Sequence, residues 1–334
     1  MHNEVRLDSK TLGLCPLGDY YDPNEIVKMS LDAEKNGFSE VWVPEHFCSG
    51  DAISVLGTLA YMTKKIHLAT GIVGATVRHP VLTAMSMANL QSISKGRMTL
   101  GLGLTVLNWL DRLGYDHTRP LTLINESFTI IKRMLEGQTV NFEGKYFTAK
   151  GMKLTYVPKR RIPIFIAAVG PLMLDFAARN ADGILLTAVC SPSYVEKARK
   201  IVIDSAKASG RNSFPLIYSL ILSSIGQETN SALVNSLLDM LGRPGRAKQV
   251  LAEGTYNEKK MDEMVEAMKA GRRDIARSYL TEEIIDQVVV RGASSKCEET
   301  LSRFEKAGID LPVLMPVPGT YKATARLAAR IRGV

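Results

Sequence analysis

The sequence lacks the features of a membrane protein or a secreted protein. Its 334 residues contain no run of about 18 consecutive apolar residues, the length that a membrane-spanning helix requires. The first ten residues, MHNEVRLDSK, have no apolar core of the kind found in secretory signals. We therefore expect a cytoplasmic protein without a membrane partner.

Cysteine is scarce and dispersed. The four cysteines are Cys15, Cys48, Cys190 and Cys297, with no CxxC pair and no Cys/His cluster at the spacing of a zinc site. Disulfide frameworks and structural zinc sites need such groupings. We therefore expect no metal and no disulfide, and four free, buried thiols.

Aromatic residues are also few, at 7%, and the net charge of +8 comes from basic residues scattered along the chain. A nucleic-acid-binding face usually concentrates basic residues and adds aromatic side chains that stack on bases. The composition therefore argues against a nucleic-acid partner. The excess of positive charge would instead suit an anionic small molecule, such as a phosphorylated cofactor.

What the sequence does contain is an alternation of short apolar segments and helical patterns. Eight apolar segments are expected strands: residues 12–17, 39–47, 66–73, 97–103, 162–170, 183–188, 215–222 and 311–317. Strands that are apolar along their whole length indicate a parallel sheet covered on both faces. Eight of them favour a single-domain (β/α)8 barrel (TIM barrel) over residues 1–334, with an open doubly wound sheet as the alternative.

Two segments interrupt the alternation. Residues 139–157 alternate in polarity and are rich in Tyr and Phe, which predicts an inserted hairpin before the fifth strand. Residues 227–283 are too long for one connection and carry dense charge. We expect extra helices there, after the seventh strand. They would form a lid over the barrel mouth, a dimer contact or a solvated surface helix pair.

The candidate catalytic residues lie at the end of the second expected strand, because active sites of this fold collect where strands end. His46 stands beside Glu45 at this end, and histidine is the side chain best suited to proton transfer near neutral pH. The alternative role for His46 is a histidine at the barrel rim that only hydrogen-bonds a loop backbone.

Two glycine-containing segments are candidate cofactor contacts. Val169, Gly170 and Pro171 open a helix whose free backbone N–H groups would suit an anionic cofactor tail. Gly101 and Gly103 do not complete a dinucleotide fingerprint, since the third glycine is missing. At a strand end they would instead let a flat ring approach the backbone.

The chain resembles the bacterial-luciferase-like superfamily of flavin- and deazaflavin-dependent enzymes. The matching motifs occur in family order at residues 42–46, 69–72, 78–80, 94–103, 163–171, 181–183 and 307–310. The length and the segment GPLML at residues 170–174 are most similar to the coenzyme F420-dependent branch, which includes methylenetetrahydromethanopterin reductase and F420-dependent dehydrogenases.

This resemblance implies a deazaflavin across the barrel mouth and a non-proline cis peptide between Gly71 and Ile72. It implies that Glu45 and His46 are catalytic, with His46 assisting proton movement during hydride transfer. The cofactor-binding residues that it implies are Glu45, Gly71, Ile72, Gly103, Thr105, Ala168, Val169, Gly170 and Thr187. It also implies a homodimer.

Two departures from the family pattern concern the substrate. Many F420-dependent enzymes carry an acid where this chain has Val106, and the methanopterin reductase uses a glutamate where it has Cys15. These losses put the pterin reaction in doubt, although Asp111, Asp116 or Glu126 could compensate.

Three functions therefore stay open. The first is an F420-dependent oxidoreductase that moves a hydride between the deazaflavin and a small carbonyl, alcohol or pterin-type substrate. The second is an FMN-dependent monooxygenase with residues 227–283 as its lid. The third is a barrel that binds a flavin, or nothing, without turnover.

Overall fold

A parallel barrel forms the centre of the molecule. The computed structural model describes residues 11–226 and 230–333, so the N-terminal segment expected to lack a signal, residues 227–229 and residue 334 lie outside it. The eight barrel strands are β1 (Gly13–Leu14), β2 (Glu40–Val43), β3 (His67–Thr70), β5 (Met98–Gly103), β8 (Ile164–Ala167), β9 (Gly183–Leu186), β10 (Leu216–Ile225) and β12 (Leu311–Pro316).

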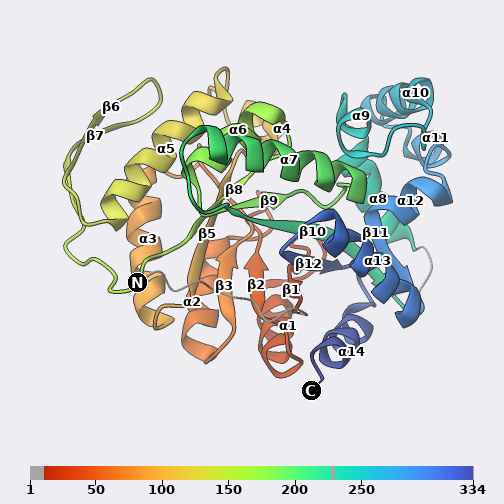
Figure 1. Cartoon of the computed structure of the whole chain (residues 1–334), viewed down its shortest axis with the longest axis horizontal. Coiled ribbons are helices and arrows are strands. Elements are labelled where there is room, and N and C mark those ends of the chain that lie inside the picture. The colour runs from red at the N-terminus through yellow and green to blue at the C-terminus, as the bar shows by residue number, and fades with distance from the viewer. Residues whose placement is uncertain (1–10, 227–229, 334) are drawn as a thin grey trace.

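The strands pair in chain order, and β12 returns to β1, so the sheet closes on itself. The predicted (β/α)8 barrel is therefore confirmed, and the open doubly wound sheet is excluded. Helices cover the outside of the barrel (Figure 1). They are α1 (Pro23–Lys35), α2 (Ala52–Met62), α3 (Pro80–Ile93), α5 (Pro120–Leu135), α6 (Pro171–Asn180), α7 (Pro192–Ala208), α13 (Ser294–Ala307) and α14 (Tyr321–Arg332).

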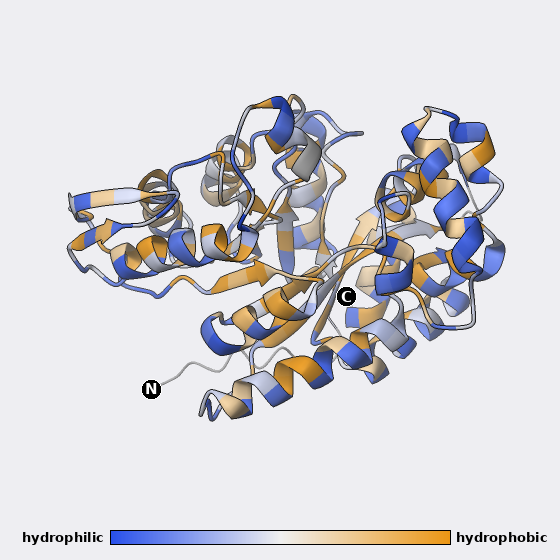
Figure 2. Cartoon of the chain, turned by 90° about the horizontal axis from the view of Figure 1, so that it is seen from above, coloured by the Kyte–Doolittle hydropathy of each residue, from blue (hydrophilic) through white to orange (hydrophobic). Residues whose placement is uncertain are grey.

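Local sequence signals explain where these helices begin. At the start of α1, Asp22 accepts a hydrogen bond from the backbone of Glu25 while the Glu25 side chain bonds back, a capping box followed by Pro23 in the first turn. Figure 2 shows hydrophobic residues along the central strands and mixed faces on the surrounding helices, as a barrel buried under amphipathic helices requires.

Several predicted strand ends were wrong, and one strand and one helix were missed. The expected strand 39–47 ends at Val43, since Pro44 interrupts the ladder. The expected strand 66–73 breaks after Thr70 at a cis Gly71–Ile72 peptide, and β4 (Val73–Gly74) then pairs with β5. The sequence analysis missed β11 (Val289–Gly292), which pairs with β10, and α4 (Leu107–Arg112).

The two insertions have the predicted secondary structure. The hairpin β6 (Val140–Glu143) and β7 (Thr148–Met152) is antiparallel and projects from the barrel (Figure 1). The later segment holds α8 (Ser231–Leu241), α9 (Arg246–Val250), α10 (Glu258–Lys269) and α11 (Arg273–Arg277), and α12 (Glu282–Val288) begins at its end. The backbone N–H of Ser191, after β9, donates to Val250 O at 2.9 Å, which fixes α9 over that loop.

Aromatic side chains fill the inside of the barrel. The Trp42 ring centroid lies 5.5 Å from Phe165 and 5.9 Å from Tyr218, and Phe165 lies 4.8 Å from Tyr218. Because β2 is not a neighbour of β8 or β10, these contacts cross the interior. Glu40 accepts hydrogen bonds there from Trp42 Nε1 (2.8 Å) and the Tyr218 hydroxyl (3.3 Å), and burial raises its pKa to about 7.

Because side chains fill this interior, a ligand site has to lie at the barrel mouth. Within residues 11–226 and 230–333, no helix has both the length and the apolar character needed to cross a membrane.

Candidate functional site

His46 pairs with a carboxylate at the barrel mouth. Its Nδ1 lies 2.7 Å from Oδ1 of Asp19, which belongs to the loop after β1. The hydrogen bond from His46 is the largest cause of the lowered pKa of Asp19, so the carboxylate is ionised and can only accept. Nδ1 therefore carries a hydrogen, and Nε2 is the ring atom left to exchange a proton with a ligand.

The hydrogen bonds of His46 involve both a side chain and the backbone. The His46 ring bonds a carboxylate, whereas the alternative role had it bonding only a loop backbone. Its backbone N–H does bond Gly50 O, at 3.0 Å, which ties down the loop after β2. The sequence analysis missed Asp19, which stands in the loop between β1 and the capping residue of α1.

Aromatic rings form a wall beside His46. Trp109, on α4, presents its ring edge-on to the His46 imidazole at 5.5 Å between centroids and lies 5.1 Å from the Phe47 ring. The loops after β1, β2 and β5 thus meet around one imidazole. Trp109 was not among the predicted site residues, because α4 was not predicted.

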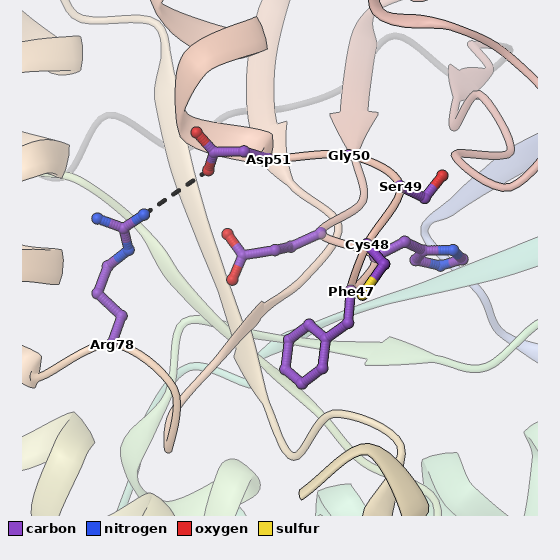
Figure 3. A pocket seen from close by; sticks show the side chains of 8 residues that line it. Phe47, Cys48, Ser49, Gly50, Asp51 and Arg78 are labelled. Carbon is purple, nitrogen blue, oxygen red and sulfur yellow. Dashed lines mark ion pairs between the residues drawn. The ribbon is translucent and has the colours of Figure 1, made fainter. Parts of the chain in front are cut away.

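A pocket of about 340 Å³ opens beside the Asp19–His46 pair (Figure 3). It is lined by Glu45, His46, Phe47, Cys48, Ser49, Gly50, Asp51 and Arg78. Figure 3 shows Arg78 facing Asp51 across this pocket, and the Arg78 Nη2 and Asp51 Oδ1 atoms lie 3.6 Å apart. The pocket therefore combines charged groups of both signs with an apolar ring.

Glu45 offers an unused oxygen to this pocket. Its backbone N–H donates to Ile72 O at 3.3 Å, so the loop after β2 is joined to the cis peptide. Its Oε2 is buried and has no hydrogen-bond partner among the residues that the structure describes. Burial is the main cause of its raised pKa, the negative charge of Asp51 adds to it, and Arg78 opposes it. A polar atom of this kind is normally satisfied, so it fits a bound ligand that supplies the partner.

The first group of predicted cofactor residues lies between β3 and β4 and at the end of β5. The Gly71 N–H donates to Val43 O at 2.7 Å, and the expected cis peptide between Gly71 and Ile72 is present. A Cβ on Gly103 would lie 2.7 Å from Ile72 Cδ1, so this glycine makes room for the Ile72 side chain. The sequence analysis expected Gly103 to let a flat ring approach the backbone, whereas the structure shows that this glycine is needed for the packing of Ile72. Thr105, partly buried, lies beyond it against Gly74.

The second group lies at the ends of β8 and β9. Ala168 is buried and donates to Leu185 O at 3.2 Å, and Thr187 follows β9. Gly170 is the N-cap of α6, as predicted, and no side chain caps the helix. The Tyr194 hydroxyl donates to Val169 O and holds this loop in place.

Several motif residues have structural roles instead. Arg97 bonds Ala60 O, Ile66 O, Ser94 O and both oxygens of Thr63, which fixes the end of α2. Asp182 and Asp310 each accept from a strand backbone, at Ile164 and Ile217 respectively. These motif residues stabilise the barrel, and the candidate site at the barrel mouth is formed by the segments around His46 and Ile72.

The carboxylates named as possible replacements for the missing acids are already engaged. Glu126 accepts three backbone N–H groups of the hairpin turn, from Lys145, Tyr146 and Phe147. Asp111 lies 2.7 Å from His117, and Asp116 lies 3.3 Å from Lys145.

The cysteine prediction was wrong at one position. Cys15, Cys190 and Cys297 are buried free thiols, as expected, and burial raises the pKa of Cys15 to about 12. Cys48 is exposed instead, in the pocket loop, with a φ of 63°. Among the described residues, no cluster of His, Cys, Asp and Glu is placed to hold a metal.

Comparison with known proteins agrees with this architecture. A sequence model of the family described as luciferase-like monooxygenase matches residues 3–311. The 5,10-methylenetetrahydromethanopterin reductase of Archaeoglobus fulgidus is 29% identical over 299 residues, 87% of this chain and 88% of the relative. The F420-dependent glucose-6-phosphate dehydrogenase of Rhodococcus hoagii is 29% identical over 237 residues, 66% of this chain and 70% of the relative.

A solved structure is similar over almost the whole chain. The coenzyme F420-dependent tetrahydromethanopterin reductase from Methanopyrus kandleri has a TM-score of 0.81 at 26% identity, covering 97% of this chain and 98% of that one. The similarity therefore includes the inserted hairpin and the helices after β10 as well as the barrel.

Proposed function

The chain belongs to the luciferase-like monooxygenase family, and from this membership we propose that it is an F420-dependent oxidoreductase. It transfers a hydride between the deazaflavin and a small carbonyl, alcohol or pterin-type substrate. The F420-dependent relatives support the cofactor, and the Asp19–His46 pair beside the pocket is the observation that carries the chemistry.

The residues of this chain would handle the proton. Bound F420 accepts or supplies the hydride. In the direction of alcohol oxidation, His46 Nε2 would take the hydroxyl proton of the substrate, and in reduction it would return that proton to the oxygen. Asp19 holds the imidazole in the tautomer that leaves Nε2 free and stabilises the imidazolium. The Trp109 ring excludes water from one side of the imidazole.

Glu45, with its unpartnered buried oxygen, would hold a polar group of the cofactor ring. Gly71, Ile72, Gly103 and Thr105 would contact the ring from the strand ends. Four more residues would carry the cofactor tail: Ala168, Val169, Gly170 and Thr187.

The second candidate is an FMN-dependent monooxygenase. The description of the matching family supports it, as does the hydrogen bond that places α9 over the loop after β9, where helices α8 to α12 could shield a reactive flavin from water.

Binding of purified apoprotein to F420 and, separately, to FMN tests both candidates by fluorescence quenching and calorimetry. Tight F420 binding with weak FMN binding is the expected result. The reverse would favour the monooxygenase, with oxygen consumption as the next assay. If neither bound, both proposals would lose their basis.

We also propose that the enzyme is a homodimer. Helices α2 and α3 expose large apolar side chains to the surface. They are Tyr61, Met62, Leu82, Met85 and Ile93. Apolar groups gathered on neighbouring helices are typical of a surface that another protein covers.

A further inference from the structure

A positively charged side chain that has no counter-ion among the described residues lies near the predicted cofactor residues. Arg246 begins α9, and its Nη1 is buried with no hydrogen-bond partner in the part of the chain that the structure describes. No carboxylate of the described residues forms an ion pair with it. Asp239, whose charge acts on the neighbouring Arg243, is already paired with Arg273 at 2.7 Å.

Arg243 adds a second cation to the same place. Its Nε donates to the backbone oxygen of Asp239 at 3.0 Å, which fixes the side chain without neutralising it. Its pKa is lowered, first by burial and then by the positive charge of Arg246, while Asp239 opposes both. The two guanidinium groups therefore lie close enough for their positive charges to interact.

The position of α9 joins these arginines to the mouth. The α9 backbone accepts from Ser191, and the Gln249 side chain lies beside Gly170, 3.6 Å from where a Cβ would stand. The charge of Arg246 acts on both Cys190 and Tyr194, and the Tyr194 hydroxyl is bonded to Val169 O. Arg246 therefore stands next to the loops after β8 and β9.

None of these neighbours can supply the missing negative charge. Burial raises the pKa of Cys190 to about 12 and also raises the pKa of Tyr194, so both stay neutral at physiological pH. A buried guanidinium nitrogen without a hydrogen-bond partner is costly, even where the rest of the side chain is partly exposed as in Arg246, because polar groups leave water readily only when they are paired. A partner from outside the chain would remove this cost.

We propose that Arg246, assisted by Arg243, binds a phosphate or carboxylate group of a ligand held at the barrel mouth. Guanidinium groups bind such planar or tetrahedral anions through paired hydrogen bonds. The anion comes either from the cofactor, since F420 carries a phosphodiester and glutamate carboxylates, or from an acidic substrate. The cofactor source rests on the proposed function, whereas anion binding itself does not.

The test uses Arg246→Gln, Arg246→Lys and a matched control, Arg179→Gln, which removes an arginine that pairs with Asp175 on α6. Affinities are measured by fluorescence titration for F420, for its deazaflavin riboside without the tail, and for FMN and riboflavin. Thermal unfolding is followed with and without inorganic phosphate at constant ionic strength.

If the anion belongs to the cofactor, Arg246→Gln weakens binding of F420 by roughly ten- to hundredfold and leaves binding of the riboside unchanged. If it belongs to the substrate, F420 affinity is unchanged, and the stabilisation of the wild type by phosphate disappears in Arg246→Gln. Arg246→Lys retains the charge, so its F420 affinity in the first case, and its stabilisation by phosphate in the second, lies between the values of the wild type and of Arg246→Gln.

The inference is overturned if Arg246→Gln behaves as Arg179→Gln does toward every ligand, phosphate included. A wild type that binds no flavin but is stabilised by phosphate through Arg246 would overturn the proposed function alone. Removing the unpaired buried nitrogen of Arg246 should leave the melting temperature of the ligand-free protein unchanged or raise it, whereas loss of a structural residue would lower it.

Discussion

Asp19 Oδ1 and His46 Nδ1 face each other at 2.7 Å, although the two residues come from different loops and stand 27 positions apart in the chain. The loops after β1 and β2 are neighbours because these strands pair, with Leu14 opposite Val41. The barrel closure therefore creates the dyad, and the ring orientation of His46 depends on a residue that the sequence does not mark.

Replacing Asp19 by Asn should lower kcat by roughly a hundredfold or more, because the amide can donate to Nδ1 and so favours the wrong tautomer of His46. The pH profile of kcat should change as well, while the affinity for F420 should be nearly unchanged. Steady-state kinetics across pH would measure both. The control is Asp116→Asn, in the loop between α4 and α5, where Asp116 forms an exposed ion pair with Lys145 of the hairpin. An unaltered rate and profile in Asp19→Asn would remove the positioning role of Asp19.

Cys48 should be the thiol that reacts in the folded protein. It is exposed at the pocket, while Cys15, Cys190 and Cys297 are buried. Ellman's reagent should therefore modify one thiol per native chain, and Cys48→Ser should abolish that reaction. Bound F420 should slow the modification if the cofactor occupies the pocket. Equal rates with and without saturating F420 would place the cofactor elsewhere.

Glu40 should make stability depend on pH. Burial raises its pKa to about 7, above the ordinary 4.5, so the folded state holds a proton that the unfolded state releases. The free energy of unfolding should fall as pH rises from about 4.5 to about 7, by an amount on the order of 3 kcal/mol. Urea unfolding of the wild type and Glu40→Gln across this range would test it. A Glu40→Gln protein with the wild-type slope would contradict the assignment.

A charge on the exposed face of α3 should dissociate the proposed dimer. Met85 is 46% exposed there, and Met85→Glu would bury a charge at an apolar contact. Analytical ultracentrifugation should show a monomer for this variant. Ile275→Glu, at a 44% exposed position on α11, should leave the assembly intact. A wild type that sediments as a monomer at every concentration would rule the dimer out.

The sequence predicted the barrel because its signals are local. Apolar runs and capping residues such as Asp22 decide strands and helices without knowledge of the rest of the chain. The rule that active sites lie at strand ends selected Glu45 and His46, and the resemblance selected the cis Gly71–Ile72 peptide, which the structure contains.

What escaped prediction depends on contacts between distant segments. Asp19 and Trp109 reach His46 only because three loops meet at one end of the barrel. Arg246 lies beside the loops after β8 and β9 because of how α9 packs on them. The hydrophobic periodicity of the sequence does not predict this packing. The strand β11 follows α12 directly, without a glycine or proline to separate the two patterns.

The aromatic rings that cross the barrel have a consequence for the order of events in catalysis. Trp42, Phe165 and Tyr218 block the barrel interior, so two ligands bound at the mouth would both have to enter and leave from the same side. The one that lies deeper has to arrive first and depart last. The kinetics would then follow an ordered binding mechanism. An excess of the outer ligand would inhibit turnover, because it would prevent the inner ligand from leaving after it has reacted.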